Sequence, residues 1–172
     1  MGRTLLLTGR PGVGKTTVIK QVAKTLGDQA GGFYTEEIRG HDGRRVGFRL
    51  VTLEGDEAVM AHVDLRGQQR PRVSRYGVDV DAIERVGVVA LQDATTSNRV
   101  VIVDEIGKME LFSDAFKEAV EQAVTGDARV LGTVTRSRRQ WVDELKADNR
   151  VTVWEVTVEN RDDLPERIRR WL

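Results

Sequence analysis

Cysteine is absent from this chain of 172 residues, which excludes disulfides, a thiolate nucleophile and any metal site built on cysteine. A net charge is missing as well, because 27 Lys and Arg residues balance 27 Asp and Glu residues. Without a basic excess, the chain has no overall attraction for nucleic acid or for an anionic membrane surface. We therefore expect no membrane partner, and nucleic acid is a disfavoured partner.

Long hydrophobic runs are also missing. The longest uncharged apolar run, residues 86–91, is far too short to span a membrane. The apolar stretch at residues 5–7 is too short for a signal peptide, and a glycine-rich motif follows it at once. The composition, 40% hydrophobic and 31% charged, is typical of a globular protein. We expect one domain over residues 1–172, a cytoplasmic location and an unknown oligomeric state, with a monomer slightly favoured.

What the sequence does contain is an alternation of strand-like and helix-like segments, which is typical of a parallel sheet covered by helices. This pattern predicts an α/β fold. The predicted strands are residues 4–8, 99–103, 129–134 and 151–156. The predicted helices are residues 16–26, 79–95, 113–125, 138–146 and 163–172.

One segment, about residues 33–76, breaks this alternation. Strand-like runs at residues 33–38 and 45–53 flank a turn that contains Asp42 and Gly43, and Asp-Gly between such runs indicates a β-hairpin. Two further runs, at residues 59–63 and 72–76, extend the pattern. We therefore predict an inserted antiparallel hairpin beside the main sheet, at its edge.

The strongest signal is a phosphate-binding loop. Residues 9–16 match the Walker A pattern G-x-x-x-x-G-K-[ST] at every position, between an apolar strand and an amphipathic helix. The glycines let successive N–H groups point at one place on a helix N-terminus. We expect Lys15 to reach the β- and γ-phosphates, and the Thr16 hydroxyl to bind Mg²⁺. The candidate nucleotide-binding residues are Gly9, Arg10, Pro11, Gly12, Val13, Gly14, Lys15, Thr16 and Thr17.

Two carboxylates follow a second buried strand, in the manner of a Walker B motif. Asp104 and Glu105 come directly after four β-branched residues. We expect Asp104 to hold Mg²⁺ through water, and Glu105 to orient or deprotonate a water that attacks the γ-phosphorus. A second acid here favours hydrolysis, because a kinase needs its acceptor hydroxyl where that water would sit. Glu105 and Lys15 are therefore the candidate catalytic residues, and Mg²⁺ is the predicted cofactor.

Other functions fit the same residues. Residues 104–107 also match the D-x-x-G of regulatory GTPases, but the chain contains no N-K-x-D sequence to select guanine, so we expect loose base specificity. Two alternatives to a hydrolase stay open. One is a nucleoside or nucleotide kinase with background hydrolysis, and the other is a nucleotide-dependent switch protein.

The run D-E-I-G-K-M-E-L at residues 104–111, with residues 9–16, 32–37 and 159–165, resembles the thermophilic-type nucleoside-triphosphatase family in its archaeal and bacterial form. The resemblance spans nearly the whole chain. It implies a three-layer αβα P-loop domain with a RecA-like, mostly parallel sheet that slowly hydrolyses several triphosphates (ATP, GTP, CTP and UTP) to diphosphate and phosphate with Mg²⁺. It also implies a second nucleotide-site segment, made of Val100, Val101, Ile102, Val103, Asp104, Glu105, Ile106 and Gly107.

The resemblance also sharpens the expected strand order. P-loop proteins with a catalytic Glu beside the metal Asp usually place one strand between the P-loop strand and the acid strand. Residues 129–134 are the candidate, which predicts the order 151–156, 4–8, 129–134, 99–103. Thr133 would then lie near the γ-phosphate or the attacking water, although β-propensity alone explains this residue equally well.

Several other residues are weaker candidates. Arg136 and Arg138 follow the predicted strand at its catalytic end, where a cation would meet charge that develops on the γ-phosphate. A run of arginines such as this one is more often a solvent-exposed basic turn without a catalytic role. Tyr34 and Arg39 lie in the predicted hairpin and would cover the nucleotide if the hairpin folds over the cleft.

Overall fold

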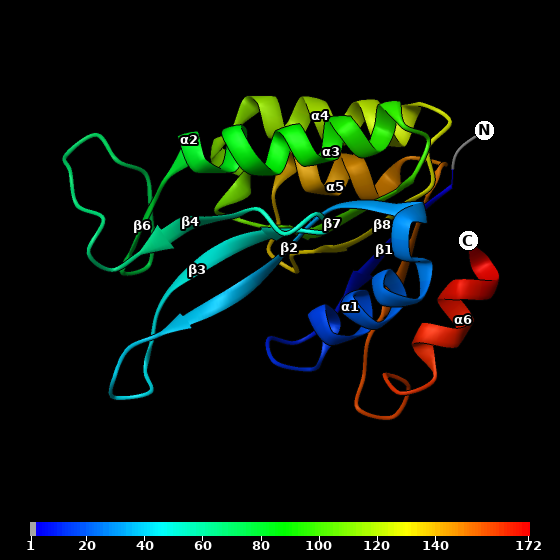
Figure 1. Ribbon diagram of the computed structural model, residues 1–172, viewed down its shortest axis with the longest axis horizontal. Helices are drawn as coiled ribbons and strands as arrows, with labels where there is room; N and C mark the ends of the chain where they lie inside the picture. The colour runs from blue at the N-terminus through cyan, green and yellow to red at the C-terminus, as the bar shows by residue number, and fades with distance from the viewer. Residues whose placement is uncertain (1–2) are drawn as a thin grey trace.

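The computed structural model describes residues 3–172, which build one mixed sheet of nine strands with helices on both faces (Figure 1). The strand order is β5-β6-β4-β3-β2-β7-β8-β1-β9. The parallel part comprises β1 (Thr4–Thr8), β7 (Val100–Ile106), β8 (Val130–Val134) and β9 (Val151–Glu155). Strand β8 lies between β1 and β7, as predicted, so the loop after β1 and the acids of β7 lie at the same edge of the sheet.

The acid strand is longer than predicted. It continues through both acids to Ile106, whose carbonyl accepts the N–H of Thr135, and Ile106 pairs with Val134 after a shift in register. Asp104 and Glu105 therefore lie in the last part of β7 instead of in the loop that follows it.

Strand β2 (Ala30–Arg39) connects the parallel strands to an antiparallel extension. Residues 30–33 pair in parallel with β7, and residues 33–39 pair with β3 (Arg45–Thr52) in the antiparallel sense. The remaining strands of the extension are β4 (Glu57–His62), β5 (Arg72–Val73) and β6 (Tyr76–Val78). The predicted hairpin is therefore present, but its first strand starts inside the main sheet instead of lying beside it.

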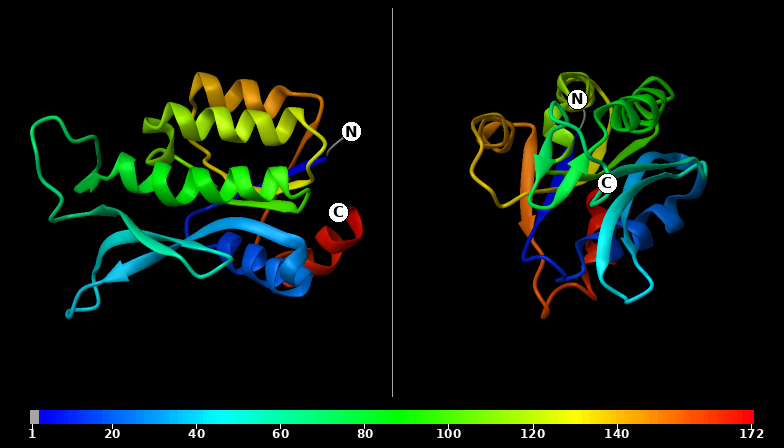
Figure 2. Two further views of the ribbon diagram at one scale, coloured as in Figure 1. Left: turned by 45° about the horizontal axis from the view of Figure 1, so that its top comes forward. Right: turned by 90° about the vertical axis from the view of Figure 1, so that its left-hand side faces the viewer.

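Helices form a layer on each face of the sheet (Figure 2). Helices α1 (Lys15–Leu26) and α6 (Leu164–Trp171), with the short η1 (Gly27–Gln29), lie on one side. The other side carries α2 (Val80–Ala82), η2 (Ile83–Val88), α3 (Val89–Thr96), η3 (Glu110–Phe112), α4 (Asp114–Thr125) and α5 (Gln140–Ala147). The three-layer α/β prediction is thereby confirmed.

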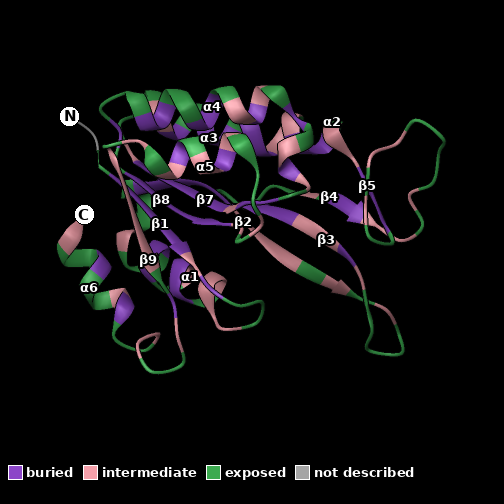
Figure 3. Cartoon of the chain, turned by 180° about the vertical axis from the view of Figure 1, so that it is seen from behind, coloured by how far each residue is buried: buried purple, intermediate pink, exposed green. Residues whose placement is uncertain are grey.

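The core follows from the strand alternation. Leu5 and Leu7 pack with α1 and α6, whereas Leu6 between them packs with the opposite layer. The parallel strands are buried on both faces, and burial falls toward the far ends of β2 and β3 (Figure 3). Within residues 3–172, no helix combines the length and apolar character that crossing a bilayer requires.

Candidate active site

The loop between β1 and α1 has the shape expected of a phosphate cradle. Gly12 and Gly14 adopt φ angles of +76° and +113°, which glycine reaches without the penalty of a side chain. The first N–H groups of α1 have no helical partners and are available to an anion. Lys15 Nζ donates to the carbonyl oxygens of Gly9 (3.0 Å) and Arg10 (3.2 Å), so the ammonium lies over the loop.

Asp104 is the point where four elements meet. Thr16 Oγ1 of α1 donates to Asp104 Oδ2 at 2.8 Å, and Thr133 Oγ1 of β8 donates to Asp104 Oδ1 at 2.5 Å. The backbone N–H of Thr35 in β2 also points to Oδ2, at 3.5 Å. Asp104 is only 2% exposed. The hydroxyl and the carboxylate predicted to share a metal ion are therefore adjacent, and Thr133 contacts the carboxylate.

Burial changes the acidity of this cluster. Burial raises the pKa of Asp104, while the hydrogen bonds from Thr133 and Thr16 lower it. Burial, and next the negative charge of Asp104, raise the pKa of Glu105, while Lys15 lowers it. A carboxylate with a raised pKa takes up a proton more readily, which suits the role of general base.

A third carboxylate at the site, Glu110, is not among the residues predicted from the sequence. It begins the short helix η3 and is 3% exposed. A methyl group built on Gly107 would lie 2.7 Å from Glu105 Oε1 and 3.0 Å from Glu110 Oε2, so both carboxylates lie against this glycine. Burial, and next the charge of Glu105, raise the pKa of Glu110 well above its usual range. The only sequence signal for it is its place in the run at residues 104–111.

These groups border a cavity of about 720 Å³. The predicted residues that line it are Gly9, Pro11, Gly12, Gly14, Lys15, Thr16, Thr17, Asp104, Glu105 and Arg136. Arg10 and Val13 of the loop do not line it, and Val13 packs against the core instead. Of the second segment, Val100, Val101, Ile102, Val103, Ile106 and Gly107 are buried and do not line it either. Strand residues that are buried between two helical layers cannot also face the cavity. Of the predicted second segment, only Asp104 and Glu105 therefore line it.

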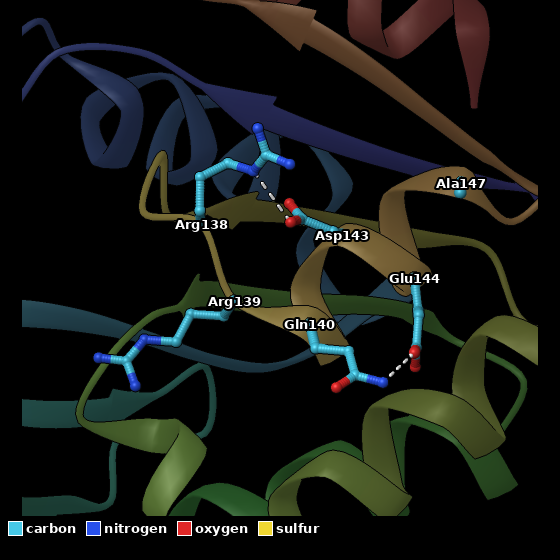
Figure 4. A pocket seen from close by; sticks show the side chains of 6 residues that line it. All are labelled: Arg138, Arg139, Gln140, Asp143, Glu144 and Ala147. Atoms are coloured by element: carbon cyan, nitrogen blue, oxygen red, sulfur yellow. Dashed lines mark hydrogen bonds and ion pairs between the residues drawn. The ribbon is translucent and has the colours of Figure 1, made fainter.

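The arginine predictions separate in the structure. Arg136 lines the cavity, but Arg138 turns toward α5, where its Nε lies 3.0 Å from Asp143 Oδ2 (Figure 4). Arg138 and Arg139 line a separate depression at the start of α5 (Figure 4). The structure therefore places Arg138 outside the cavity lining, where it pairs with an acidic residue of the next helix.

The two hairpin candidates, Tyr34 and Arg39, also lie outside the cavity lining. Tyr34 lies beneath the Lys20 ammonium, 4.5 Å from its ring centre, and lines another depression between α1 and β3. Arg39 pairs with Glu37 and donates to the Gly43 carbonyl near the hairpin tip. Tyr34 contacts α1 through Lys20, and Arg39 lies beyond the last residue of β2 that lines the cavity, so neither reaches the phosphate loop. The hairpin aromatic that lines the cavity is Phe48.

The chain is similar to known proteins over nearly its whole length. The model of a family described as NTPase matches residues 4–169. The nucleoside-triphosphatase THEP1 of Thermotoga petrophila is 44% identical over 164 residues, which cover 95% of this chain and 89% of that protein. The human cancer-related nucleoside-triphosphatase is 42% identical over 178 residues, covering 95% and 93%. The crystal structure of THEP1 from Aquifex aeolicus superposes with a TM-score of 0.87 at 35% identity, covering 96% of both chains.

Sequence, fold and relatives therefore agree on one assignment: the chain has the P-loop NTPase fold and belongs to the nucleoside-triphosphatase family, whose members are hydrolases acting on nucleoside triphosphates.

Proposed function

We propose that this protein hydrolyses nucleoside 5′-triphosphates (ATP, GTP, CTP and UTP) to nucleoside diphosphate and phosphate in a Mg²⁺-dependent reaction. The observation that carries the proposal is the meeting of Lys15, Thr16, Asp104 and Glu105 at one cavity. Their sequence separation is large, yet the C-terminal ends of β1 and β7 bring the phosphate loop and the acids together.

The residues present fit a magnesium ion. The Thr16 hydroxyl and the Asp104 carboxylate lie 2.8 Å apart and offer hard oxygen donors, which Mg²⁺ prefers. Thr133 holds the second carboxylate oxygen and so fixes the orientation of Asp104. When bound there, the ion would neutralise charge on the β- and γ-phosphate oxygens.

Side chains of the protein bind the phosphates and accept the proton. Lys15 exchanges its loop carbonyls for oxygens of the β- and γ-phosphates. Glu105 accepts a proton from the attacking water, whose oxygen bonds to the γ-phosphorus while the bond to the β–γ bridging oxygen breaks. Arg136, which lines the cavity, is the remaining candidate for contact with the γ-phosphate. Broad base selectivity, a cytoplasmic location and a monomeric state stay predictions.

The test measures phosphate release from ATP, GTP, CTP and UTP, each with Mg²⁺ and each with excess EDTA. We expect release from several nucleotides, and only with Mg²⁺. Glu105→Gln should bind Mg²⁺–ATP as the wild type does, and its turnover should fall by about 10²-fold or more, because the proton acceptor is lost.

Glu144→Gln, an exposed position on α5, is the matched control and should keep the full rate. Equal rates in wild type and Glu105→Gln would assign the base to another residue. Binding of all four nucleotides without phosphate release from any would overturn the proposal.

A further inference from the structure

The cavity extends beyond the residues that can hold phosphate. Its far part, the distal half, is lined by Glu36 and Glu37 of β2, Phe48 of β3, Met60 of β4, Val73 of β5 and Met109 from the segment after β7. These residues come from the antiparallel extension and from the turn before η3. None of them belongs to the predicted phosphate-binding residues.

The sheet order places the distal half on the γ-phosphate side of the site. From the P-loop strand β1, the order runs through β8 and the acid strand β7 to β2, β3 and β4. Thr16 and Asp104, which are hydrogen-bonded to each other, are the residues that would hold the metal, so the γ end of a bound triphosphate would face β7. On the opposite side of β1, Arg161 donates to the carbonyl of Val13 at 3.1 Å, next to the loop. A nucleotide bound with its γ-phosphate at Asp104 extends its nucleoside toward that side and leaves the distal half free.

The two carboxylates of the distal half favour an occupant that can donate hydrogen bonds. These carboxylates already have cationic partners: Glu36 lies 2.8 Å from both Lys20 and Arg49, and Glu37 lies 3.0 Å from Arg45. Two lysines also line the cavity beside these groups: Lys20 of α1, which is paired with Glu36, and the exposed Lys108 of the turn before η3.

Its shape and polarity suit a planar molecule with hydroxyl groups. The Phe48 ring and the Met109 thioether offer flat, adaptable apolar surfaces. Glu36 and Glu37 supply oxygen lone pairs that accept hydrogen bonds from hydroxyl or ring N–H groups. The whole cavity, with the phosphate loop included, has a volume of about 720 Å³, which is within the range of sites for small organic ligands.

We propose that the distal half is an acceptor subsite for a hydroxyl-bearing heterocycle of the nucleoside class. The acceptor hydroxyl takes the place of the attacking water and gives its proton to Glu105. Its oxygen bonds to the γ-phosphorus, the bond from that phosphorus to the β–γ bridging oxygen breaks, and the electron pair leaves with the nucleoside diphosphate. The products are a phosphate monoester and the diphosphate. This inference rests on the proposed function, because it uses the same phosphate site and the same base.

The test uses the full chain with Mg²⁺ and ATP labelled in its γ-phosphate, and adds adenosine, guanosine, cytidine, uridine or thymidine in turn. We expect at least one nucleoside to become a labelled monoester and to raise ADP formation about tenfold or more, because a positioned hydroxyl outcompetes water. The measured quantity is the ratio of labelled monoester to labelled phosphate.

A pair of variants locates the subsite. Val73→Glu places a charge in the distal half and should lower that ratio about tenfold or more. Val59→Glu makes the same change at a residue of β4 that is 45% exposed and outside the cavity lining, and should leave the ratio unchanged. The melting temperature of each variant is measured in parallel, and the wild-type result decides the proposal if Val73→Glu does not fold.

Each outcome has one meaning. Phosphate release without any labelled nucleoside overturns the acceptor subsite and leaves the proposed function standing, as does a nucleoside that only accelerates phosphate release. Labelled nucleoside at equal ratios in both variants overturns the location. Neither phosphate nor monoester from ATP overturns the proposed function as well.

Discussion

Asp104 and Glu105 are neighbours in the chain and yet have different surroundings. Thr16 and Thr133 donate to both oxygens of Asp104, which fixes its orientation. Glu105 lies against Gly107 and shares that position with Glu110. At the scale of residues, the site thus joins one carboxylate held by hydroxyl donors to a pair of buried carboxylates that lie against the same glycine. The first arrangement suits a metal ligand and the second suits a proton acceptor.

The Glu110 carboxyl predicts a dependence of stability on pH. Its pKa is raised well above the value in the unfolded chain, so the unfolded chain releases this proton first as the pH rises. The stability contributed by neutral Glu110 is therefore complete below the unfolded pKa and is lost as the pH rises through the folded pKa. The raised pKa values of Asp104 and Glu105 act in the same direction.

We expect the free energy of unfolding, measured with urea, to fall between pH 5 and pH 8 for the wild type. Glu110→Gln cannot ionise and should reduce this fall by about 1 kcal/mol or more. Glu118→Gln, at an exposed position on α4, is the control and should show the wild-type fall. An identical fall in Glu110→Gln would mean that Glu110 does not carry the raised pKa.

At the scale of elements, β2 decides the architecture of the site. It pairs in parallel with β7 over residues 30–33 and then continues past the end of β7 into the antiparallel extension. The same strand therefore presents the Thr35 N–H to Asp104 and carries Glu36 and Glu37 into the distal half. Gly32 sits at this join with a φ of +107°, and a methyl group there would overlap the Ile102 carbonyl oxygen of β7.

Gly32→Ala should therefore separate β2 from β7. We expect the free energy of unfolding to fall by about 3 kcal/mol or more, since strain from the positive φ adds to the overlap. Gly43→Ala is the matched control: its φ is +76°, but a methyl group there meets no atom within 4 Å, so about 1 kcal/mol should be lost. Equal losses in urea unfolding would show that β2 adjusts to the methyl group without leaving β7.

At the scale of the whole molecule, the site is assembled from segments far apart in the chain. The loop after β1, the end of β7, Thr133 of β8 and Thr35 of β2 meet at one edge of the sheet. Such a site forms only when the sheet forms. A ligand that binds this site must then stabilise the whole fold, because it binds the folded chain alone.

The corresponding prediction concerns thermal unfolding. Mg²⁺ with a non-hydrolysable ATP analogue at about 100 times its dissociation constant should add about 2.7 kcal/mol of stability, which raises Tm by about 5–10 °C for a chain of this size. Lys15→Ala should lose most of this shift, because the phosphates lose their cation. Lys24→Ala, on the same helix and outside the cavity lining, should keep it. An unchanged Tm in the wild type would contradict nucleotide binding at the loop.

The sequence alone determined the features that depend on local pattern. The glycine spacing of residues 9–16, the apolar runs of β1 and β7 and the strand between them were predictable, because each is encoded by neighbouring residues or by the family resemblance. The helix that Asp79 caps was predictable for the same reason, although its middle part is a π-helical stretch. These features placed Lys15, Thr16, Asp104 and Glu105 at one edge of the sheet.

Only the tertiary structure decided which other side chains join them. Glu110 reaches Gly107 through the turn of η3, and Arg136 reaches the cavity while Arg138 turns to Asp143. Tyr34 faces α1, although residues 36 and 37 of the same strand line the cavity. The physical reason is that these outcomes depend on competing partners from distant segments. The chain pattern fixes where a residue stands on its element, and the packed neighbours fix where its side chain points.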